Sequence, residues 1–433
     1  MIAEFTLETF RSYRQATLPL STLTLLIGAN ASGKSNALEG LRMLSGLAKG
    51  QYLSDVFQTL RKDGSIRGTM DDLTYGTHET FALGCVTNRV PDWRNLVVKV
   101  RHDEKELLIE KETIDRPGST FPLYRVAQPA GRYGHELRVA YNNFARGGIK
   151  PQITCDNRQA VFTQLTTPAR FSTPQAQRKL PEVTQAFRQM LENILFLDPA
   201  PRRMRDYSFV TDNELQGDGA NLSSVLFWLC ERQDQKAQVL AFIRALPEQD
   251  IRDVGFVETP RNEVMVRLTE SFGGQTREWD AAILSDGTLR VLAVAAAVLS
   301  ATRGSLVVIE EIDNGVHPSR AHTLLENIQK AAQERNLHVL LTTHNPALLD
   351  ALPIKAIPDV VACYRDPVKG DSRLVRLESL PDYPELMAQG SVGSLMTRGI
   401  LEKYLKRLPE SREEKIAKAL SWLESLKQEE VEP

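Results

Sequence analysis

The segment IGANASGKSN, residues 27–36, constrains the fold of this chain more than any other feature. It fits the spacing G-x-x-x-x-G-K-[ST], with an apolar run before it and an apolar-periodic segment after it. Gly28 and Gly33 allow the backbone to turn so that successive N–H groups face an anion at the start of a helix. The sequence therefore predicts a phosphate-binding loop between a strand at 22–27 and a helix at 34–47.

The same loop predicts ligands for a nucleoside triphosphate and its metal. Lys34 supplies a charge for the β- and γ-phosphates, and the Ser35 hydroxyl is placed to bind Mg²⁺. The other predicted nucleotide contacts belong to the loop and the first turn of the helix: Asn30, Ala31, Ser32, Gly33 and Asn36. A glycine-rich turn that only joins a strand to a helix is the alternative. The spacing and the context favour nucleotide binding.

The composition is that of an ordinary globular protein, with 42% apolar and 25% charged residues in 433. A formal net charge of -2 argues against a chain coated with nucleic acid, although it allows local basic patches. The longest apolar run, 291–301, is shorter than the roughly 18 to 20 residues of a membrane span. The acidic N-terminus does not resemble a signal peptide. The four cysteines stand apart: Cys85, Cys155, Cys230 and Cys363. These features predict a cytoplasmic protein without disulfides or a zinc site.

Hydrophobic periodicity divides the chain into several parts. Alternation over 78–112 predicts antiparallel strands, with weaker strand signals as far as Leu165. Helical spacing then follows, and a β pattern returns after Pro247. The expected units are a discontinuous head of residues 1–165 and 247–400 with an antiparallel β part, an inserted helical subdomain of residues 166–246, and a C-terminal helical tail of residues 401–433.

The tail contains a capping box, Ser411 with Glu414, before an apolar stripe. The stripe has helical spacing: Ile416, Ala419, Leu420, Trp422, Leu423 and Leu426. It predicts a terminal helix that either folds onto its own domain or docks onto a partner.

The segment SLVVIEEIDNGVHP, residues 305–318, predicts an apolar strand that ends in two carboxylates. Glu310 would hold Mg²⁺, directly or through water, and Glu311 would accept a proton from the attacking water. Most strands of this kind end in Asp, and Glu310 is one methylene longer. The alternative is a polar strand end that is simply solvated.

The segment LSDGTLRVLAVAAAVLS, residues 284–300, places Ser285 and Gly287 before a helix with almost no polar face. Such a helix must be buried, and its N-terminus offers free N–H groups to an anion. A second anion site beside a single triphosphate loop suggests that this site serves a neighbouring molecule. The alternative is a helix cap that satisfies only the backbone.

The segment LLTTHNPALLD, residues 340–350, ends an apolar strand next to His344. A histidine at the carboxyl edge of a sheet, beside a phosphate site, can donate to the γ-phosphate. The alternative is a histidine in a loop without a function.

In this order, the four motifs resemble those of ABC-type ATPase heads. Four segments are similar in sequence to the RecF/SMC/OLD-related ATPases of prokaryotes: FRSYRQATLPLSTLTLLIGANASGKSNALEGLRML, ILSDGTLRVLAV, VVIEEIDNGVHP and LLTTHNPALLD. DGANLSSVL at 218–226 and GSVGSLMTRGILE at 390–402 also resemble that group, so the similarity covers most of the chain. The resemblance implies an α/β P-loop NTPase of ABC-ATPase type, with an antiparallel β subdomain and an inserted helical subdomain. Because the chain ends soon after the histidine strand, it resembles OLD-like members without a TOPRIM nuclease domain.

The resemblance also implies a head-to-tail homodimer, with ATP and Mg²⁺ held between the loop of one subunit and LSDG of the other. Ser285 and Gly287 would then contact the γ-phosphate in trans. The residues acting in cis would be Lys34, Ser35, Glu310, Glu311 and His344. Asn30 and residues 313–317 would lie near the interface. A coupling glutamine is expected as well, and Gln58 is its nearest candidate by position.

The leading functional hypothesis is an ATP-hydrolysing switch whose dimer state controls a separate nuclease or toxin in anti-phage defence. Its support is a full set of ATPase motifs without effector chemistry. The alternative is a DNA-binding clamp of recombination or repair, which predicts a basic surface. The dense basic cluster is Arg202, Arg203 and Arg205, which could equally be ion-paired. A transporter ATPase is the third possibility. Two features count against that class: SDG stands where transporter signatures have SGG, and a long insert separates the phosphate loop from this motif.

Overall fold

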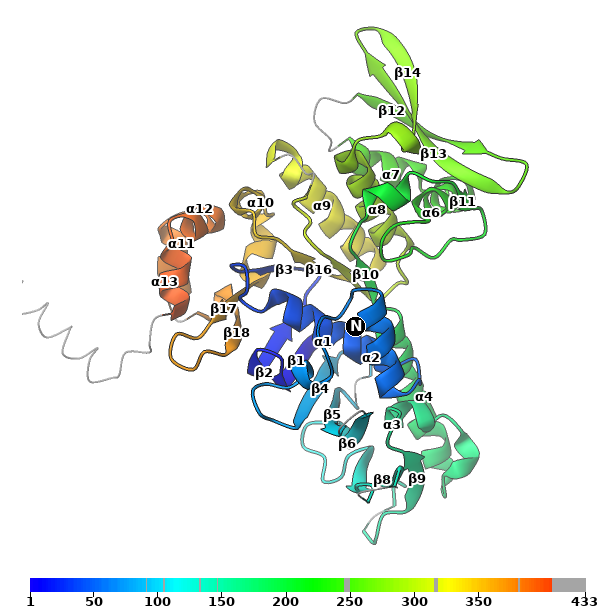
Figure 1. Ribbon diagram of the computed structural model, residues 1–433, viewed down its shortest axis with the longest axis vertical. Helices are drawn as coiled ribbons and strands as arrows, with labels where there is room; N and C mark the ends of the chain where they lie inside the picture. The colour runs from blue at the N-terminus through cyan, green and yellow to red at the C-terminus, as the bar shows by residue number, and fades with distance from the viewer. Residues whose placement is uncertain are drawn as a thin grey trace, which may run out of the picture.

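The computed structural model describes residues 1–90, 92–103, 106–131, 134–145, 147–244, 250–314, 318–380 and 382–406. A mainly parallel sheet lies at the centre of the molecule (Figure 1). Its strands in spatial order are β10 (Leu195–Leu197), β15 (Leu306–Ile309), β16 (His338–Thr342), β3 (Leu23–Ile27), β17 (Val360–Arg365) and β18 (Ser372–Arg376). β18 is antiparallel to β17, and the other neighbouring pairs are parallel.

The central strands are buried on both faces, which explains their continuous apolar runs. In β3, Leu23 and Leu25 pack into one hydrophobic core, whereas Leu26 packs into the other. Successive side chains of a strand point to opposite faces, so a sheet covered on both sides needs apolar residues at every position. The strands predicted at 22–27, 305–310 and 338–343 are confirmed.

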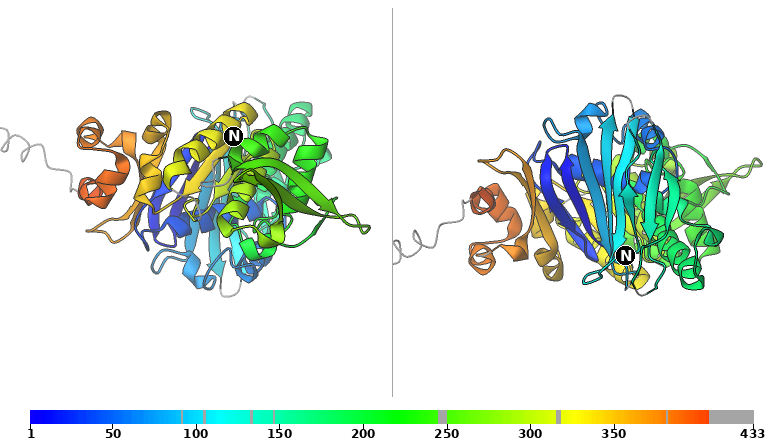
Figure 2. Two further views of the ribbon diagram at one scale, coloured as in Figure 1. Left: turned by 90° about the horizontal axis from the view of Figure 1, so that it is seen from above. Right: turned by 90° about the horizontal axis from the view of Figure 1, so that it is seen from below.

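An antiparallel sheet forms a second layer, which Figure 2 shows from below. Its strands in spatial order are β2 (Tyr13–Pro19), β1 (Ile2–Phe10), β4 (Thr80–Thr87), β5 (Asn95–Asp103), β6 (Glu106–Asp115), β7 (Tyr124–Gln128), β8 (Glu136–Tyr141) and β9 (Gln152–Asp156). The strand pattern predicted from 78–112 is confirmed, and the predicted α/β fold with an antiparallel β part is confirmed with it.

The helix after the phosphate loop, α1 (Lys34–Leu47), fills the space between the two sheets. Its Leu41 and Leu44 are fully buried and share one core with Phe5 of β1 and Val308 of β15. Three further helices border that core: α2 (Leu53–Lys62), α3 (Val161–Gln164) and α4 (Pro174–Glu192). The position of the loop is therefore fixed by two sheets at once.

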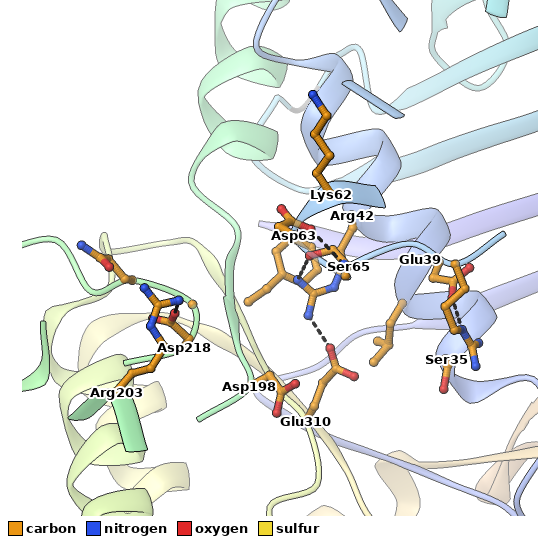
Figure 3. Close-up of a pocket in the computed structure, with 16 residues that line it drawn as sticks. Ser35, Glu39, Arg42, Lys62, Asp63, Ser65, Asp198, Arg203, Asp218 and Glu310 are labelled. Atoms are coloured by element: carbon orange, nitrogen blue, oxygen red, sulfur yellow. Dashed lines mark hydrogen bonds and ion pairs between the residues drawn. The ribbon is translucent and has the colours of Figure 1, made fainter. Parts of the chain in front are cut away.

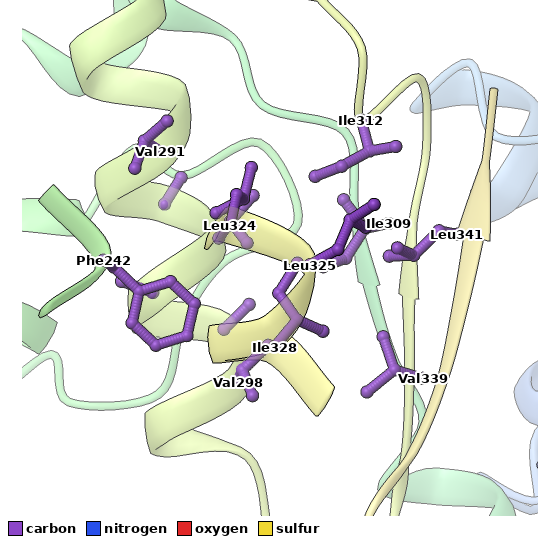
Figure 4. Packing of buried hydrophobic residues seen from close by; sticks show 14 of the residues in the cluster. Phe242, Val291, Val298, Ile309, Ile312, Leu324, Leu325, Ile328, Val339 and Leu341 are labelled. Carbon is purple, nitrogen blue, oxygen red and sulfur yellow. The ribbon is translucent and has the colours of Figure 1, made fainter. Parts of the chain in front are cut away.

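Helices cover the other face of the parallel sheet, as Figure 4 shows at close range. α8 (Asp286–Ser300) and α9 (Pro318–Arg335) lie against the sheet, and α6 (Leu222–Phe227) and α7 (Lys236–Ile243) pack outside them. A π-helical turn at Trp228–Arg232 follows α6 and precedes α7. α8 is buried from Val291 to Leu299, which confirms the prediction of a buried helix after residue 287.

Residues 166–246, predicted as one helical insert, are divided between the two cores. The apolar face of α4 packs between the antiparallel sheet and α1, whereas α6 and α7 pack with α8 on the far side. Between them, β10 joins the parallel sheet as a neighbour of β15. The predicted domain boundaries stay a prediction, but the helices of this segment do not share a core of their own.

A smaller sheet projects beside α6 and α7. It contains β11 (Ser208–Phe209), β12 (Ile251–Glu258), β13 (Glu263–Phe272) and β14 (Gln275–Asp280). Short helices complete the described chain: α5 (Pro201–Met204), α10 (Pro346–Asp350), α11 (Tyr383–Ala388), α12 (Val392–Thr397) and α13 (Ile400–Lys406). The predicted capping box, Ser411 with Glu414, and its apolar stripe lie outside the described residues. Among the helices that are described, none has the length and apolar character needed to cross a membrane.

Candidate functional site

The phosphate loop joins the carboxyl end of β3 to the first turn of α1. Gly28 has a φ of 153°, and a Cβ placed on it would lie 2.2 Å from the carbonyl oxygen of Cys363. Gly33 has a φ of 119°, and its Cβ would lie 2.5 Å from Ser372 Oγ. Both positions therefore require glycine, because other residues would be strained and would also clash.

Lys34 lies across its own loop. Its Nζ donates to the carbonyl oxygen of Gly28 at 2.5 Å and to that of Ala29 at 3.1 Å. Burial lowers the pKa of Lys34, and the negative charges of Glu311 and Asp313 oppose that shift. A bound phosphate would therefore compete with these two carbonyl oxygens for the ammonium group.

A cavity of about 350 Å³ opens above the loop. It is lined by residues of the loop and of two strand ends that are distant in sequence: Asn30, Ala31, Ser32, Gly33, Lys34, Ser35, Asn36, Glu310, Glu311 and His344. The carboxyl ends of parallel strands meet at one edge of a sheet, which explains why these residues gather there. The fold brings all the residues predicted to act in cis into one cavity.

Glu310 and Glu311 follow the end of β15 and have different surroundings. Glu310 forms an ion pair with Arg42 in the middle of α1. Glu311 has a φ of 47°, and its N–H donates to Thr342 Oγ1 at 2.9 Å. Asn314 Nδ2 donates to Glu311 Oε2 at 2.5 Å. Glu311 is thus held at a sharp bend of the chain at the cavity wall, where a non-glycine φ above zero costs energy.

His344 follows β16 and lies 3.7 Å from Asp313, measured from Nδ1 to Oδ2. The Asp313 side chain is only 6% exposed, whereas that of His344 is 55% exposed. A buried carboxylate beside one ring nitrogen can orient a histidine and leave the other nitrogen free for a ligand. Asn314 is also described, whereas residues 315–317 of the predicted interface segment lie outside the described residues.

The oxygen ligands present suit a magnesium ion that is shared with a triphosphate. Ser35 Oγ and the Glu310 carboxylate belong to the same cavity lining. Among the described residues there is no group of three His, Cys, Asp or Glu side chains that could hold a metal by itself. Mg²⁺ in nucleotide sites takes one or two protein ligands and completes its shell with phosphate oxygens and water, so this donor set fits.

A second cavity of about 780 Å³ adjoins the first, and Figure 3 shows its lining. It contains Asp198, which sequence reasoning missed. Leu197 at the end of β10 pairs with Ile309, so Asp198 stands beside Glu310 at the edge of the sheet. The available signal was the run LFLDP, an apolar strand ending in a carboxylate like the one before Glu310.

Arg67 was missed as well, because it lies in a loop without a distinctive pattern. It lines both cavities, and its Nε contacts Glu39 Oε1 at 2.8 Å. Arg365, at the end of β17, lines the smaller cavity too. Gln58 lies exposed on α2 and lines neither cavity, so its position does not suit a coupling glutamine.

Ser285 and Gly287 are outside the lining of the cavity above the loop. Ser285 Oγ caps α8 by accepting from the N–H of Thr288 at 3.1 Å, which agrees with the helix-cap alternative. Ser285 is nevertheless exposed at the N-terminus of a buried helix. Within one chain, the two predicted anion sites therefore remain separate.

The basic cluster is largely neutralised by acids. Arg203 pairs with Asp218 at 2.5 Å, and Arg205 pairs with Asp286 at 2.7 Å. Arg205 also donates to the carbonyl oxygen of Leu284 at 2.8 Å and so supports the loop before α8. Of the two possibilities for this cluster, ion pairing rather than a free basic surface is what the structure shows for Arg203 and Arg205.

Comparison with known proteins adds family relationships to this geometry. Residues 1–115 match a family model described as "AAA ATPase domain". No curated protein matches the chain. Among solved structures, an SMC head bound to the C-winged helix domain of ScpA shares 13% identity, with 86% of this chain and 96% of that one covered and a TM-score of 0.48. The SMC head domain from Thermotoga maritima shares 12%, with coverages of 87% and 98% and a TM-score of 0.41. An SMC head from Pyrococcus furiosus, bound to the C-terminal domain of ScpA, shares 12%, with coverages of 89% and 99% and a TM-score of 0.46.

A second family model spans more than half of the chain, residues 111–350. Together with the loop and the strand ends around it, this match places the chain among ATP-binding ATPase domains. The protein belongs to the P-loop ATPase family described as "AAA domain, putative AbiEii toxin, Type IV TA system".

Proposed function

We propose that this protein is an ATP-hydrolysing switch that closes into an ATP-sandwich homodimer and thereby controls a separate effector in prokaryotic anti-phage defence. One observation carries the proposal. Lys34, Ser35, Glu310, Glu311 and His344 share one cavity, whereas the exposed start of α8 lies elsewhere on the same chain. A second copy can supply that missing anion site.

The residues of the cavity divide the chemical work in cis. Lys34 leaves the carbonyl groups of its loop and binds the β- and γ-phosphates, while backbone N–H groups of the loop bind the remaining oxygens. Ser35 and Glu310 would hold the metal, which would supply positive charge to the phosphates. His344, oriented by Asp313, donates to the γ-phosphate.

Glu311 is the proposed general base. Its fixed backbone and its contact with Asn314 hold the carboxylate at the cavity wall, where it can accept a proton from the attacking water. Removing this proton makes the water a better nucleophile without changing how the phosphates are bound. The proposal therefore separates turnover from nucleotide binding.

In trans, Ser285 and Gly287 of the second copy contact the γ-phosphate. The N-terminus of α8 offers free N–H groups and the positive end of a helix dipole. Hydrolysis removes the γ-phosphate and with it this contact, so the association of the two copies weakens when the product forms. The triphosphate thus sets the lifetime of the dimer.

The name of the family that matches residues 111–350 mentions a toxin and a toxin–antitoxin system. A protein that controls an effector in defence is compatible with that name. The ion pairs of Arg203 and Arg205 give less support to the DNA clamp, because a phosphate backbone would have to displace Asp218 and Asp286.

The test uses Glu311→Gln protein, tagged and recovered from cells of its own source with MgATP, followed by identification of every retained protein and nucleic acid. The matched control carries Glu311→Gln together with Ser285→Arg, which leaves the loop intact and blocks closure. The proposal expects an effector protein with the first variant and its loss with the control. Recovery of DNA alone, dependent on closure, would favour the repair clamp and overturn the defence role.

A further inference from the structure

Behind the phosphate loop, three buried side chains bond to its carbonyl groups. Ser372 Oγ donates to the carbonyl oxygen of Ser32 at 2.6 Å, and Tyr13 Oη donates to that of Gly33 at 3.0 Å. Cys363 Sγ donates to the Ser32 oxygen at 3.4 Å and lies 3.3 Å from Tyr13 Oη. All three donors are 2% exposed or less.

These bonds fix the direction of two peptide planes. In a planar trans peptide, the C=O of one residue and the N–H of the next point in opposite directions. Holding the Ser32 carbonyl toward the back of the loop therefore turns the Gly33 N–H toward the front. The Gly33 carbonyl is held by Tyr13 and by the Ala37 N–H at 3.1 Å, and this turns the Lys34 N–H forward. These two N–H groups lie where the loop meets the first residue of α1, at the helix end that attracts phosphate groups.

The donors come from both sheets, so the loop is held between them. Tyr13 begins β2 of the antiparallel sheet, Cys363 lies on β17, and Ser372 begins β18. The N–H of Ser372 donates to the carbonyl oxygen of Ser12 at 2.7 Å, which fixes β18 against the start of β2. Gly33 leaves room for this approach, since a Cβ there would clash with Ser372 Oγ.

A short chain of polar contacts links the same cluster to α1. Asn36 Nδ2 donates to Ser12 Oγ at 2.8 Å, and Ser12 Oγ lies 2.8 Å from Ser372 Oγ. Asn36 also lines the cavity above the loop. The cluster thus reaches from the back of the loop to a residue predicted to contact the nucleotide.

We propose that Tyr13 and Ser372 are positioning residues that hold the phosphate loop in its anion-binding shape before any nucleotide arrives. The inference rests on the proposed ATPase function and assigns these two side chains a role in phosphate affinity. Neither residue touches the substrate. Each acts through the carbonyl group that it binds.

The experiment measures the affinity of purified full-length protein for MgADP and for inorganic pyrophosphate, a probe that lacks a base and a sugar. The variants Ser372→Ala and Tyr13→Phe each delete one donor and keep the packing. We expect each variant to weaken both ligands by the same factor, about two- to tenfold, because each carbonyl oxygen loses one hydrogen bond and keeps a second donor, Cys363 Sγ for Ser32 and the Ala37 N–H for Gly33. Ser21→Ala is the control, because Ser21 Oγ donates to the Leu23 carbonyl at 3.1 Å at the opposite end of β3.

Hydrogen–deuterium exchange of the loop peptide, without nucleotide, gives a second readout. We expect faster exchange over residues 27–36 in both variants and no change in Ser21→Ala. Unchanged affinity together with unchanged exchange in folded variants would overturn the proposal. If the unmodified protein bound neither ligand, the ATPase function itself would fail, and the exchange rates would still decide whether the loop is held this way. The two single variants are independent, so the misfolding of one leaves the other as the test.

Discussion

At the scale of single residues, Lys34 shows which interactions a phosphate must replace in the loop. Its ammonium group bonds to two carbonyl oxygens of its own loop, and burial lowers its pKa. A phosphate must replace these bonds, and it offers a full negative charge instead of two dipoles. Replacing Lys34 should therefore lower nucleotide affinity far more than it lowers the stability of the fold.

Lys34→Ala should abolish measurable MgATP binding and leave the thermal unfolding midpoint nearly unchanged, because it removes a half-buried charge that has no ion pair among the described residues. The measurement is a calorimetric titration of both proteins. Lys369→Ala, at the exposed tip between β17 and β18, is the matched control. Retained affinity in Lys34→Ala would remove the phosphate-loop assignment.

Glu311→Gln should lower kcat by about 10²- to 10⁴-fold, the usual contribution of a general base, with KM changed only a few-fold. Glutamine keeps the shape of the side chain and its contact with Asn314, but it cannot take a proton at neutral pH. Steady-state phosphate release and retention of bound ATP are the two readouts. Normal hydrolysis would transfer the role of base to Glu310 or to another group.

Single residues also mark the limit of sequence reasoning about the site. Lys34, Glu310 and His344 could be predicted as site residues because each one follows an apolar strand or belongs to a motif with fixed spacing. Asp198 follows such a strand too, but β10 has only three residues and gives a weak signal. Arg67 has no local signal at all, since only the packing of its loop against Glu39 brings it to the cavity.

At the scale of elements, periodicity predicted which faces are apolar but not what covers them. α1 was predicted at 34–47 and occupies Lys34–Leu47, because the glycine spacing and the apolar stripe agree. α4 and α7 were grouped into one insert, although tertiary packing assigns them to different cores. α9 was missed despite its apolar residues at helical spacing, Ala321, Leu324, Leu325, Ile328 and Ala332, all of which are buried.

β16 offers a test of how the two sheets are joined. His338 begins this strand, and its Nδ1 lies 2.7 Å from the carbonyl oxygen of Ile2 in β1. Burial lowers the pKa of His338 from its ordinary value of 6.5. The folded state therefore binds fewer protons than the unfolded state below pH 6.5, so this residue stabilises the fold above that pH and loses its contribution as the pH falls.

His338→Asn keeps a donor toward Ile2 and removes the titrating ring. The free energy of unfolding in urea, measured at pH 7.5 and pH 5, should fall less for this variant than for the unmodified protein. The difference between the two proteins isolates His338 from the other titrating groups. An equal fall in both would show that His338 is not held neutral in the fold.

At the scale of the whole molecule, the two predicted anion sites lie apart on the chain. The cavity above the loop is formed by the parallel sheet and α1, whereas the exposed start of α8 belongs to the layer on the other face. The sequence predicted both sites and their separate use. The β pattern predicted after Pro247 is confirmed by the consecutive strands β12, β13 and β14, whereas β11 was missed because it has only two residues and pairs with a distant part of the chain.

The central claim, that one nucleotide is shared by two chains, is tested most directly by mixing Lys34→Ala protein with Ser285→Arg protein and measuring ATP hydrolysis. Each variant alone lacks one half of every site. A mixed dimer contains one complete site, so random pairing of equal amounts should restore roughly a quarter of the normal rate. No recovery, once native mass measurement shows that mixed dimers form, would mean that each chain hydrolyses ATP alone and would contradict the account.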